Sequence, residues 1–205
     1  MVLTIHLHKG DLPKEAITSN LVAIDTEAMG LKFTRDRICL VQMSFGDGDA
    51  HLVQLDREVH EAPVLEGLLT DPETTKIFHY ARFDVGLLQY SFELMTAPLF
   101  CTKIASKLVR TYTERHGLKD LCRDLLGVEL SKQEQTSDWG AEKLTKQQME
   151  YAANDVLYLH RLKEKLEELL ERENRLELAQ LCFEFLPVRA HLDIMAGEEF
   201  DIFKH

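Results

Sequence analysis

Apolar residues follow two different spacings along this chain, and the change from one to the other lies near residue 60. Before it, short apolar runs of strand length are separated by polar turns, which is typical of β-strands. We expect strands over residues 3–7, 21–26, 37–45 and 50–55, with a hairpin turn at 46–49. The first part of the chain is therefore predicted to form an antiparallel meander, with residues 3–7 as an edge strand.

After residue 63 the apolar residues mostly recur every three or four positions, which predicts helices. The clearest helix begins at a capping box formed by Thr145 and Gln148, and we expect it to continue to about Arg172. Further helices are expected at 64–69, 84–94, 102–109, 117–126 and 174–185, with short strands at 76–79 and 99–101. Strands followed by alternating strands and helices predict one α/β domain over residues 1–205, with a mixed sheet and helices packed around it.

The composition is that of a globular protein, with 45% hydrophobic and 29% charged residues. A formal net charge of −11 argues against nucleic-acid binding driven by a broad basic surface, although cations at a metal site could still meet phosphates. The four cysteines form no C-x-x-C pair, which favours free thiols in a reducing compartment. Without an apolar run of about 18 residues or a signal-peptide pattern, we expect a cytoplasmic protein with no membrane partner.

Two carboxylates follow the apolar run 21–24, at Asp25 and Glu27. Side chains alternate along a strand, so both carboxylates should point to the same side. Two like charges at the end of a buried strand repel each other, and a divalent cation would relieve that repulsion. The alternative is an acidic strand end that leads into a solvated loop.

Two further acidic positions lie in predicted helices, one at a helix start and the other within the capped helix. Asp84 follows His79 and Phe83, where a strand ends and a helix begins, and its alternative role is that of a helix N-cap. Tyr151 and Asp155 are spaced i, i+4, so both project from one face of the capped helix, next to its apolar stripe. Their alternative role is a structural Tyr–Asp hydrogen bond at the edge of the core.

Together the three segments read D-x-E, H-x-x-x-F-D and Y-x-x-x-D, which resembles the DEDD family of 3′–5′ exonucleases, in its Tyr branch. Glu150 occupies the position where the other branch has His. The stretches 76–79, 100–108 and 151–163 resemble ribonuclease D-like proteins, and the ending resembles the nano-RNase C family of ring-forming bacterial oligoribonucleases. The resemblance implies an RNase H-like exonuclease fold without an additional C-terminal helical domain. Tyr80 departs from the Asn that many relatives have after the His.

The resemblance also implies a mechanism with two divalent cations, Mg²⁺ or Mn²⁺. Asp25 would bridge both ions, Glu27 and Asp155 would bind the ion that activates water, and Asp84 would hold the second. Tyr151 would orient the attacking water. The implied reaction is 3′–5′ hydrolysis of very short oligoribonucleotides, such as dinucleotides, to 5′-mononucleotides. The alternatives are a related exonuclease acting on longer RNA or on DNA, and a nucleic-acid-binding scaffold without activity.

Five residues are candidates for substrate contacts. The resemblance implies that Leu31 wedges between the last two bases, whereas its alternative role is packing behind Gly30. His79 could contact substrate or could be hydrogen-bonded in the core. A basic stripe at i, i+4 and i+7 could bind phosphates or form a solvated helix face: Lys103, Lys107 and Arg110.

The C-terminal segment is unusually apolar for a chain end. The apolar residues after Pro187 show no clear helical or strand spacing in the sequence, and irregular apolar segments often contact a neighbouring subunit. The nano-RNase C resemblance implies a ring-shaped homo-octamer. We therefore expect a homo-oligomer, with the segment 174–205, and residues 186–205 in particular, at subunit contacts.

Overall fold

The computed structural model describes residues 4–32, 34–57, 61–130, 137–197 and 202–203. Within these ranges, six strands form one sheet in the order β1-β4-β3-β2-β5-β6. Their bounds are Ile5–Lys9 (β1), Leu21–Ala28 (β2), Ile38–Ser44 (β3), Ala50–Gln54 (β4), Thr75–Phe78 (β5) and Leu99–Cys101 (β6). The strands β2, β3 and β4 pair antiparallel as expected, while β5 is parallel to both β2 and β6.

The pairing of β1 corrects one detail of the predicted meander. β1 is the edge strand, as expected, but it runs parallel to β4, with Ile5 opposite Ala50 and Lys9 opposite Gln54. A parallel pair cannot be joined by a tight turn, so the chain first crosses β2 and β3 before it returns beside β1. The apolar alternation of residues 3–7 indicates a strand but does not indicate its partner.

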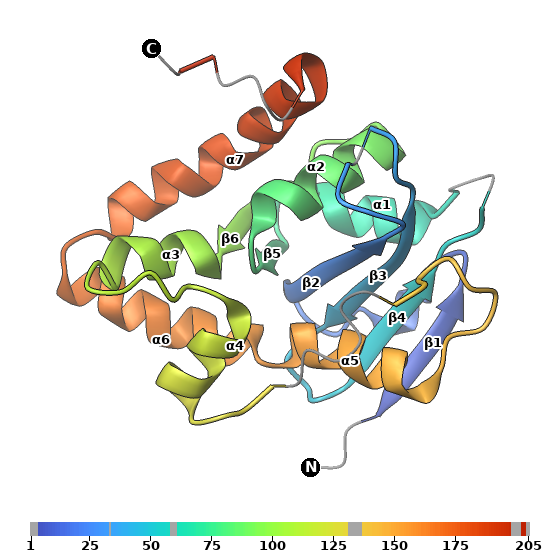
Figure 1. Ribbon diagram of the computed structural model, residues 1–205, viewed down its shortest axis with the longest axis horizontal. Helices are drawn as coiled ribbons and strands as arrows, with labels where there is room; N and C mark the ends of the chain where they lie inside the picture. Colours follow the sequence, from blue (N-terminus) through green and yellow to red (C-terminus); the bar gives the residue numbers. More distant parts are fainter. Residues whose placement is uncertain (1–3, 33, 58–60, 131–136, 198–201, 204–205) are drawn as a thin grey trace.

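Helices cover both faces of the sheet (Figure 1). The helices α1 (Pro63–Thr70) and α2 (Ala81–Phe92) lie on one side, and α5 (Lys146–Leu157) and α6 (Leu159–Arg172) lie on the other. The helix α3 (Thr102–Val109) packs against α6, and α7 (Leu176–Ala196) packs along α2. A short helix α4 (Leu118–Leu121) continues into a π-helical turn at Cys122–Leu126, which ends at Gly127. Two shorter elements complete the described chain: the 3₁₀ turn Lys14–Ala16 and the β3–β4 hairpin turn.

The predicted helix over 145–172 is divided at Tyr158 into α5 and α6. Its start is confirmed, because the Thr145 side chain accepts a hydrogen bond from the Gln148 N–H and the Gln148 side chain accepts one from the Thr145 N–H. α5 packs across β2, β3 and β4, whereas α6 packs against β5 and α3. The two halves therefore share β2 but otherwise have different partners, and the apolar spacing alone does not show the change of direction between them.

The last helix extends well beyond its predicted end. α7 continues through Pro187 to Ala196, although a proline inside a helix costs about 3 kcal/mol relative to alanine. Tertiary packing overrides this cost: the Asp193 carboxylate is buried and accepts hydrogen bonds from Arg82 on α2 and from Arg189. The prediction of an irregular apolar segment after Pro187 is therefore wrong for the described residues up to 196.

The core contains one unusual charge. Lys76 on β5 is completely buried, and its Nζ donates hydrogen bonds to the backbone oxygens of Asp71 and Ala97. Burial lowers the pKa of Lys76 to about 8. This ammonium connects the segment before β5 to the segment before β6.

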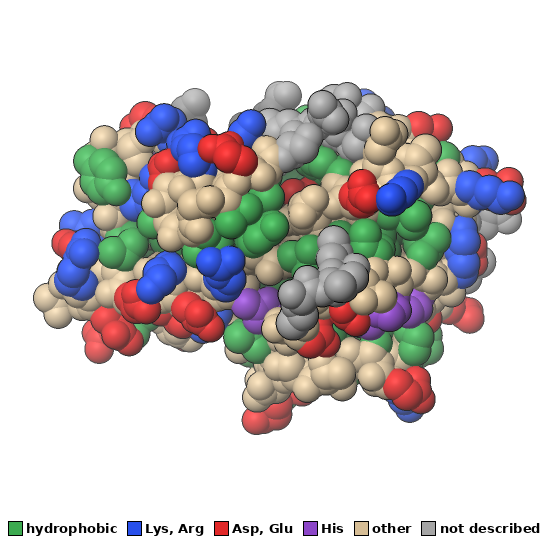
Figure 2. Space-filling view, turned by 90° about the horizontal axis from the view of Figure 1, so that it is seen from below, with side chains coloured by type: hydrophobic (Ala, Val, Ile, Leu, Met, Phe, Trp, Pro, Cys, Tyr) green, Lys and Arg blue, Asp and Glu red, His purple; other side chains and the backbone are tan. Residues whose placement is uncertain are grey.

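The described face of the molecule in Figure 2 has no broad basic region, and the cysteines are free thiols, as the composition predicted. Figure 2 shows acidic and basic side chains interspersed over one face, with no continuous basic band. All four cysteines are free thiols: Cys39, Cys101, Cys122 and Cys182. Among the described helices, none is long and apolar enough to cross a membrane.

Candidate active site

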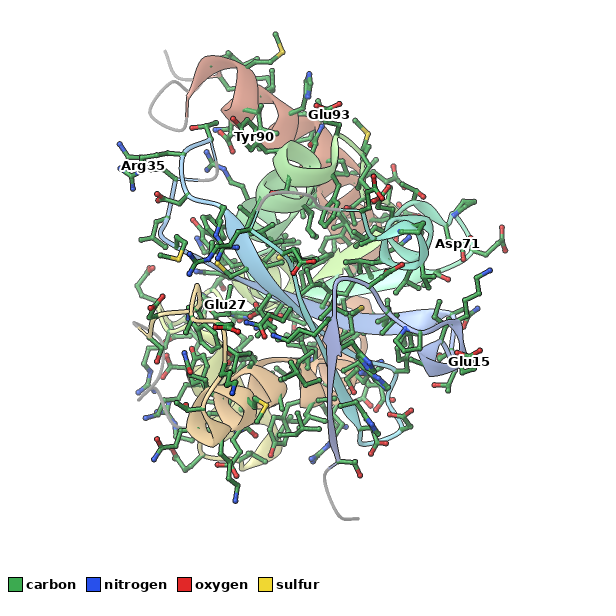
Figure 3. All side chains as sticks on the ribbon, turned by 90° about the vertical axis from the view of Figure 1, so that its right-hand side faces the viewer. Glu15, Glu27, Arg35, Asp71, Tyr90 and Glu93 are labelled. Atoms are coloured by element: carbon green, nitrogen blue, oxygen red, sulfur yellow. The ribbon has the colours of Figure 1, made fainter. Side chains whose placement is uncertain are left out.

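Three carboxylates converge beside the end of β2. Asp25 and Glu27 come from β2 and Asp155 comes from α5, and each offers an oxygen within 4.8 Å of those of the other two. Figure 3 shows Glu27 between the end of β2 and the helix α5, while Arg35 points away into solvent. The i, i+2 spacing on a strand and the i, i+4 spacing on a helix therefore bring their side chains to one place, as the sequence predicted.

The fourth predicted carboxylate, Asp84, is buried next to this group. Its Oδ1 accepts a hydrogen bond of 2.6 Å from the Thr26 hydroxyl, which lies between Asp25 and Glu27 in sequence. The helix α2 begins at Ala81, so Asp84 lies inside its first turn and not at the N-cap. The N-cap position belongs to Tyr80, which has a left-handed backbone conformation (φ 67°, ψ 41°). The alternative role of Asp84 as an N-cap is therefore wrong.

The four carboxyl groups strongly disfavour simultaneous ionisation. Burial, followed by the charge of Asp155, raises the pKa of Glu27 to about 9. Burial raises the pKa of Asp84 and of Asp155 to about 7 each. The pKa of Asp25 is raised well above its usual range by burial and then by the charges of Asp84, Asp155 and Glu27.

This donor set fits divalent cations. Carboxylate oxygens alone, without His or Cys, are the ligands that Mg²⁺ and Mn²⁺ prefer. Positive charge at this point would also stabilise the ionised carboxylates and reduce the repulsion between them. The chain therefore offers Asp25, Glu27 and Asp155 as direct ligands, with Asp84 beside them.

Tyr151 lies one helical turn before Asp155 and hydrogen-bonds to it. Burial, followed by the charges of Asp155, Glu27 and Asp25, raises the pKa of Tyr151 above its ordinary value. The hydroxyl therefore stays protonated at neutral pH and acts as a hydrogen-bonding group. Its ring lies against Trp139, with the two ring centres 6.1 Å apart, so the position of Tyr151 is fixed from both sides.

Two polar residues of the site were missed in the sequence. Thr26 binds Asp84, and the Gln42 amide donates a hydrogen bond of 3.0 Å to Asp25 Oδ2. Gln42 is directly opposite Asp25 on the neighbouring strand β3 and is completely buried. In the sequence, Gln42 stands out as a polar residue within the apolar run 38–43. Only the strand register shows that its partner is Asp25.

The loop after β2 exposes apolar side chains next to the carboxylates. Leu31 is 78% exposed and Met29 is 53% exposed, so Leu31 does not pack behind Gly30. The Asp36 carboxylate supports the loop, since it accepts hydrogen bonds from the Lys32 N–H and from Arg35. A Cβ at Gly30 would lie 2.3 Å from Asp36 Oδ2, so a side chain at this position would displace the Asp36 carboxylate.

The predicted substrate contacts lie in two different environments. His79 is largely buried with its Nδ1 2.9 Å from the Thr102 hydroxyl, and burial followed by the Lys103 charge lowers its pKa to about 3. Its imidazole is therefore neutral. Lys103 lies 3.9 Å above the Tyr80 ring, and Lys107 follows one turn later on α3.

Arg110 is arranged differently from the expected basic stripe. It lies just beyond α3, is 3% exposed, and pairs with Asp124 and with the backbone oxygen of Arg115. Its guanidinium therefore holds the loop before α4, and phosphate contact by Arg110 stays a prediction with less support than that by Lys103.

The fold and the carboxylate geometry agree with comparisons against known proteins. A family model described as 3′–5′ exonuclease matches residues 10–171, which is most of this chain. The chain belongs to the 3′–5′ exonuclease family. The NrnC protein of Brucella melitensis bound to pGG is 54% identical over 100% of both chains, with a TM-score of 0.96. A second structure of the same protein, with bound Mg²⁺, is 53% identical over 98% of this chain and 99% of that one, with a TM-score of 0.94.

The chain is thus an NrnC-type 3′–5′ exonuclease with an RNase H-like α/β fold, which confirms the predicted family, fold class and enzyme class. Ribonuclease D of Gluconacetobacter diazotrophicus is 37% identical over 76% of this chain. The chain spans only 39% of the length of that relative. The alternative of an inactive scaffold has no support in these matches.

Proposed function

We propose that this exonuclease hydrolyses very short oligoribonucleotides from the 3′ end and releases 5′-mononucleotides. The observation that carries the proposal is the convergence of Asp25, Glu27 and Asp155 within 4.8 Å, next to the exposed Leu31. The likeness to a protein bound to pGG over the whole chain supports a substrate of about this length.

The proposed cofactors are two divalent cations, Mg²⁺ or Mn²⁺. When bound, such ions activate the attacking water and stabilise the charge that develops on the phosphodiester. Asp25 would contact both, Glu27 and Asp155 would hold the one near the water, and Asp84 would hold the other directly or through water. The Tyr151 hydroxyl would position the water, since its raised pKa argues against its acting as a base.

The exposure of Leu31 and the charge states of His79, Lys103 and Lys107 suggest how each would contact the substrate. The exposed Leu31 side chain can insert between two bases, and the neutral His79 can accept or donate one hydrogen bond through its second ring nitrogen. Lys103 and Lys107 lie on the same helix face and can contact phosphates. A related activity on longer RNA or on DNA is the alternative, because the same carboxylate chemistry would serve it.

A length series of end-labelled substrates tests the proposal. RNAs from two to about ten nucleotides, and DNAs of the same sequences, are digested with Mg²⁺ or Mn²⁺, and the rate of each step is measured. We expect the dinucleotide to give the highest kcat/KM, with 5′-mononucleotides as products. Asp155→Asn is the control for contaminating nucleases. Rapid shortening of long RNA with persistent dinucleotides would contradict the proposal.

We also propose that the protein is a homo-oligomer, most simply a ring of eight subunits, with α7 at the subunit contacts. Five apolar side chains that are between 41% and 72% exposed are spaced three, four, three and seven residues apart along α7: Leu178, Leu181, Phe185, Val188 and Met195. This spacing puts them on one helix face. Such a stripe is larger than the scattered apolar residues of a monomer surface, and a second copy of the chain could cover it.

A further inference from the structure

A group of cations lies at the same end of the sheet as the catalytic carboxylates. Lys9 ends β1, Arg37 precedes β3, and Arg57 follows β4. All three line a cavity of about 340 Å³, whose opposite wall is the segment 139–142 before α5. None of them belongs to the predicted basic stripe, because they are far apart in sequence.

Strand register places this cavity beside the active site. Glu27 is opposite Leu40, Leu40 is opposite Gln54, and Gln54 is opposite Lys9, so these four residues form one row across β2, β3, β4 and β1. Side chains in such a row share one face of the sheet, with about 5 Å between neighbouring strands. Arg37 lies nearer to the carboxylates than Lys9 does, since its backbone oxygen accepts a hydrogen bond of 3.1 Å from the N–H of Met29, two residues after Glu27.

The three cations make no salt bridge with any carboxylate of the described residues. Lys9 donates to the Gln54 side-chain oxygen and to a backbone oxygen, and within the described ranges Arg37 and Arg57 donate only to backbone oxygens. Asp56 and Glu142 also line the cavity, and in the described part of the chain neither makes an ion pair with these cations. Three positive charges without anionic partners are unexpected in a protein with a net charge of −11.

The wall of the cavity also contains an unused hydrogen-bond donor. Trp139 is only 3% exposed, and its Nε1–H has no acceptor among the described residues. Buried indole N–H groups usually have a partner. The lining thus has three cations against two carboxylates, and the three cations without ion pairs, together with the buried indole N–H, suit an acceptor-rich anion.

We propose that this cavity binds the phosphate group of a nucleotide next to the metal site. Arginine guanidinium groups match phosphate oxygens in pairs, and lysine adds a point charge. The phosphate can belong to the oligonucleotide engaged at the carboxylates or to a free 5′-mononucleotide. The proposal rests on the proposed nucleotide substrate, but its test measures binding and does not need turnover.

The test compares three double variants with the wild type. Arg37→Gln with Arg57→Gln removes two charges from the cavity, and Arg37→Lys with Arg57→Lys keeps them. The matched control is Lys14→Gln with Lys165→Gln, which removes two exposed charges outside the cavity. GMP and pGG are titrated calorimetrically in EDTA, and pGG is titrated again with Mg²⁺ in an Asp155→Asn background.

We expect the Gln pair to weaken binding by about tenfold or more, because each charge-assisted hydrogen bond contributes about 1.5–3 kcal/mol. The Lys pair should keep much of the affinity, and the control should match the wild type. For pGG, the slope of log affinity against log salt should fall by about 0.7 for each lost phosphate contact.

The outcomes also separate the two sources of phosphate. A loss for GMP assigns the cavity to a free mononucleotide, and a loss for pGG alone assigns it to the substrate strand. The proposal is overturned if the wild type binds neither ligand, or if the Gln pair binds both within twofold of the control. If the wild type binds GMP but cleaves no oligonucleotide, the proposed function fails while the cavity proposal stands.

Discussion

Burial and neighbouring carboxylates disfavour the ionised forms of the side chains at the candidate active site, as Tyr151 and Asp25 illustrate. The environment of Tyr151 favours its neutral form, whereas Asp25 is surrounded by like charges that a cation would relieve. Replacing either residue should therefore affect activity far more than folding.

We expect Tyr151→Phe to fold like the wild type and to lower kcat on the order of 10²-fold, because a positioned hydroxyl typically contributes this much. The ring keeps its contact with Trp139, so the melting temperature should change little. Steady-state kinetics on a dinucleotide, together with thermal melting, measure both effects. Unchanged turnover would show that Tyr151 has only a structural role.

Activity should disappear in EDTA, and Asp25→Asn should abolish it without unfolding the chain. Because the folded-state pKa values of the carboxyl groups are raised, to about 9 for Glu27 and about 7 for Asp84 and Asp155, the metal-free folded state binds more protons than the unfolded state above pH 4. The unfolding free energy in EDTA should therefore fall as pH rises from about 4 to about 9.

Chemical denaturation across this pH range, in EDTA and in Mg²⁺, measures the effect. Mg²⁺ should stabilise the protein more at pH 9 than at pH 6, because protons compete with the metal for the same oxygens. Asp25→Asn should show a smaller fall with pH in EDTA, because one member of the like-charge group is gone. A wild-type protein that is fully active in excess EDTA would refute the metal requirement.

Leu31→Ala should weaken dinucleotide binding by about 1–3 kcal/mol, the range of stacking contacts with a base. Leu31 is 78% exposed, so the folded protein loses little packing and the melting temperature should stay within a degree or two. Titration of a dinucleotide measures the change, and Ile17→Ala, at a partly exposed site before the start of β2, is the control. Equal affinity of the variant and the wild type would remove Leu31 from the substrate site.

At the scale of an element, a cluster of histidines on β1 and β4 makes the stability of this sheet edge depend on pH. His6, His8 and His51 stack across β1 and β4, with ring centres 4.8–6.4 Å apart, and Asp49 accepts a hydrogen bond from His6. Burial, then the charge of His6, lowers the pKa of His8 and of His51. Asp47 and Asp49 oppose this shift for His51 without reversing it.

Since the folded-state pKa values of His8 and His51 lie below the unfolded value of about 6.5, the unfolded state binds more protons as pH falls below it. The stability that the neutral rings contribute is therefore present above pH 6.5 and is lost as pH falls. In excess Mg²⁺, the unfolding free energy of His51→Gln should decrease less between pH 6.5 and pH 5 than that of the wild type. His191→Gln on α7 is the control, and identical slopes for all three proteins would contradict the prediction.

At the scale of the whole molecule, the exposed stripe of α7 predicts assembly. Light scattering at micromolar protein should give a multiple of the 23.6 kDa chain mass. Leu181→Glu with Phe185→Glu should shift the mass toward the monomer, because it puts charges into the proposed apolar contact. Gln180→Glu, on the same helix but outside the stripe, should leave the mass unchanged. A single monomer peak for the wild type would refute the proposal.

The sequence by itself determined the local parts of this protein. Period-2 and period-3.6 spacing located most strands and helices, the capping box located the start of α5, and the three acidic segments identified the carboxylate cluster and the family. These features depend on neighbours within a few residues, or on a spacing of chemical groups that is visible in the chain.

Only the tertiary structure decided how these parts meet. The parallel pairing of β1, the break at Tyr158 and the continuation of α7 through Pro187 each depend on a partner that is distant in sequence. The same holds for Gln42 beside Asp25 and for the row that joins Glu27 to Lys9. Strand register sets these neighbours, and register is fixed by the packing of the whole sheet, which no local pattern encodes.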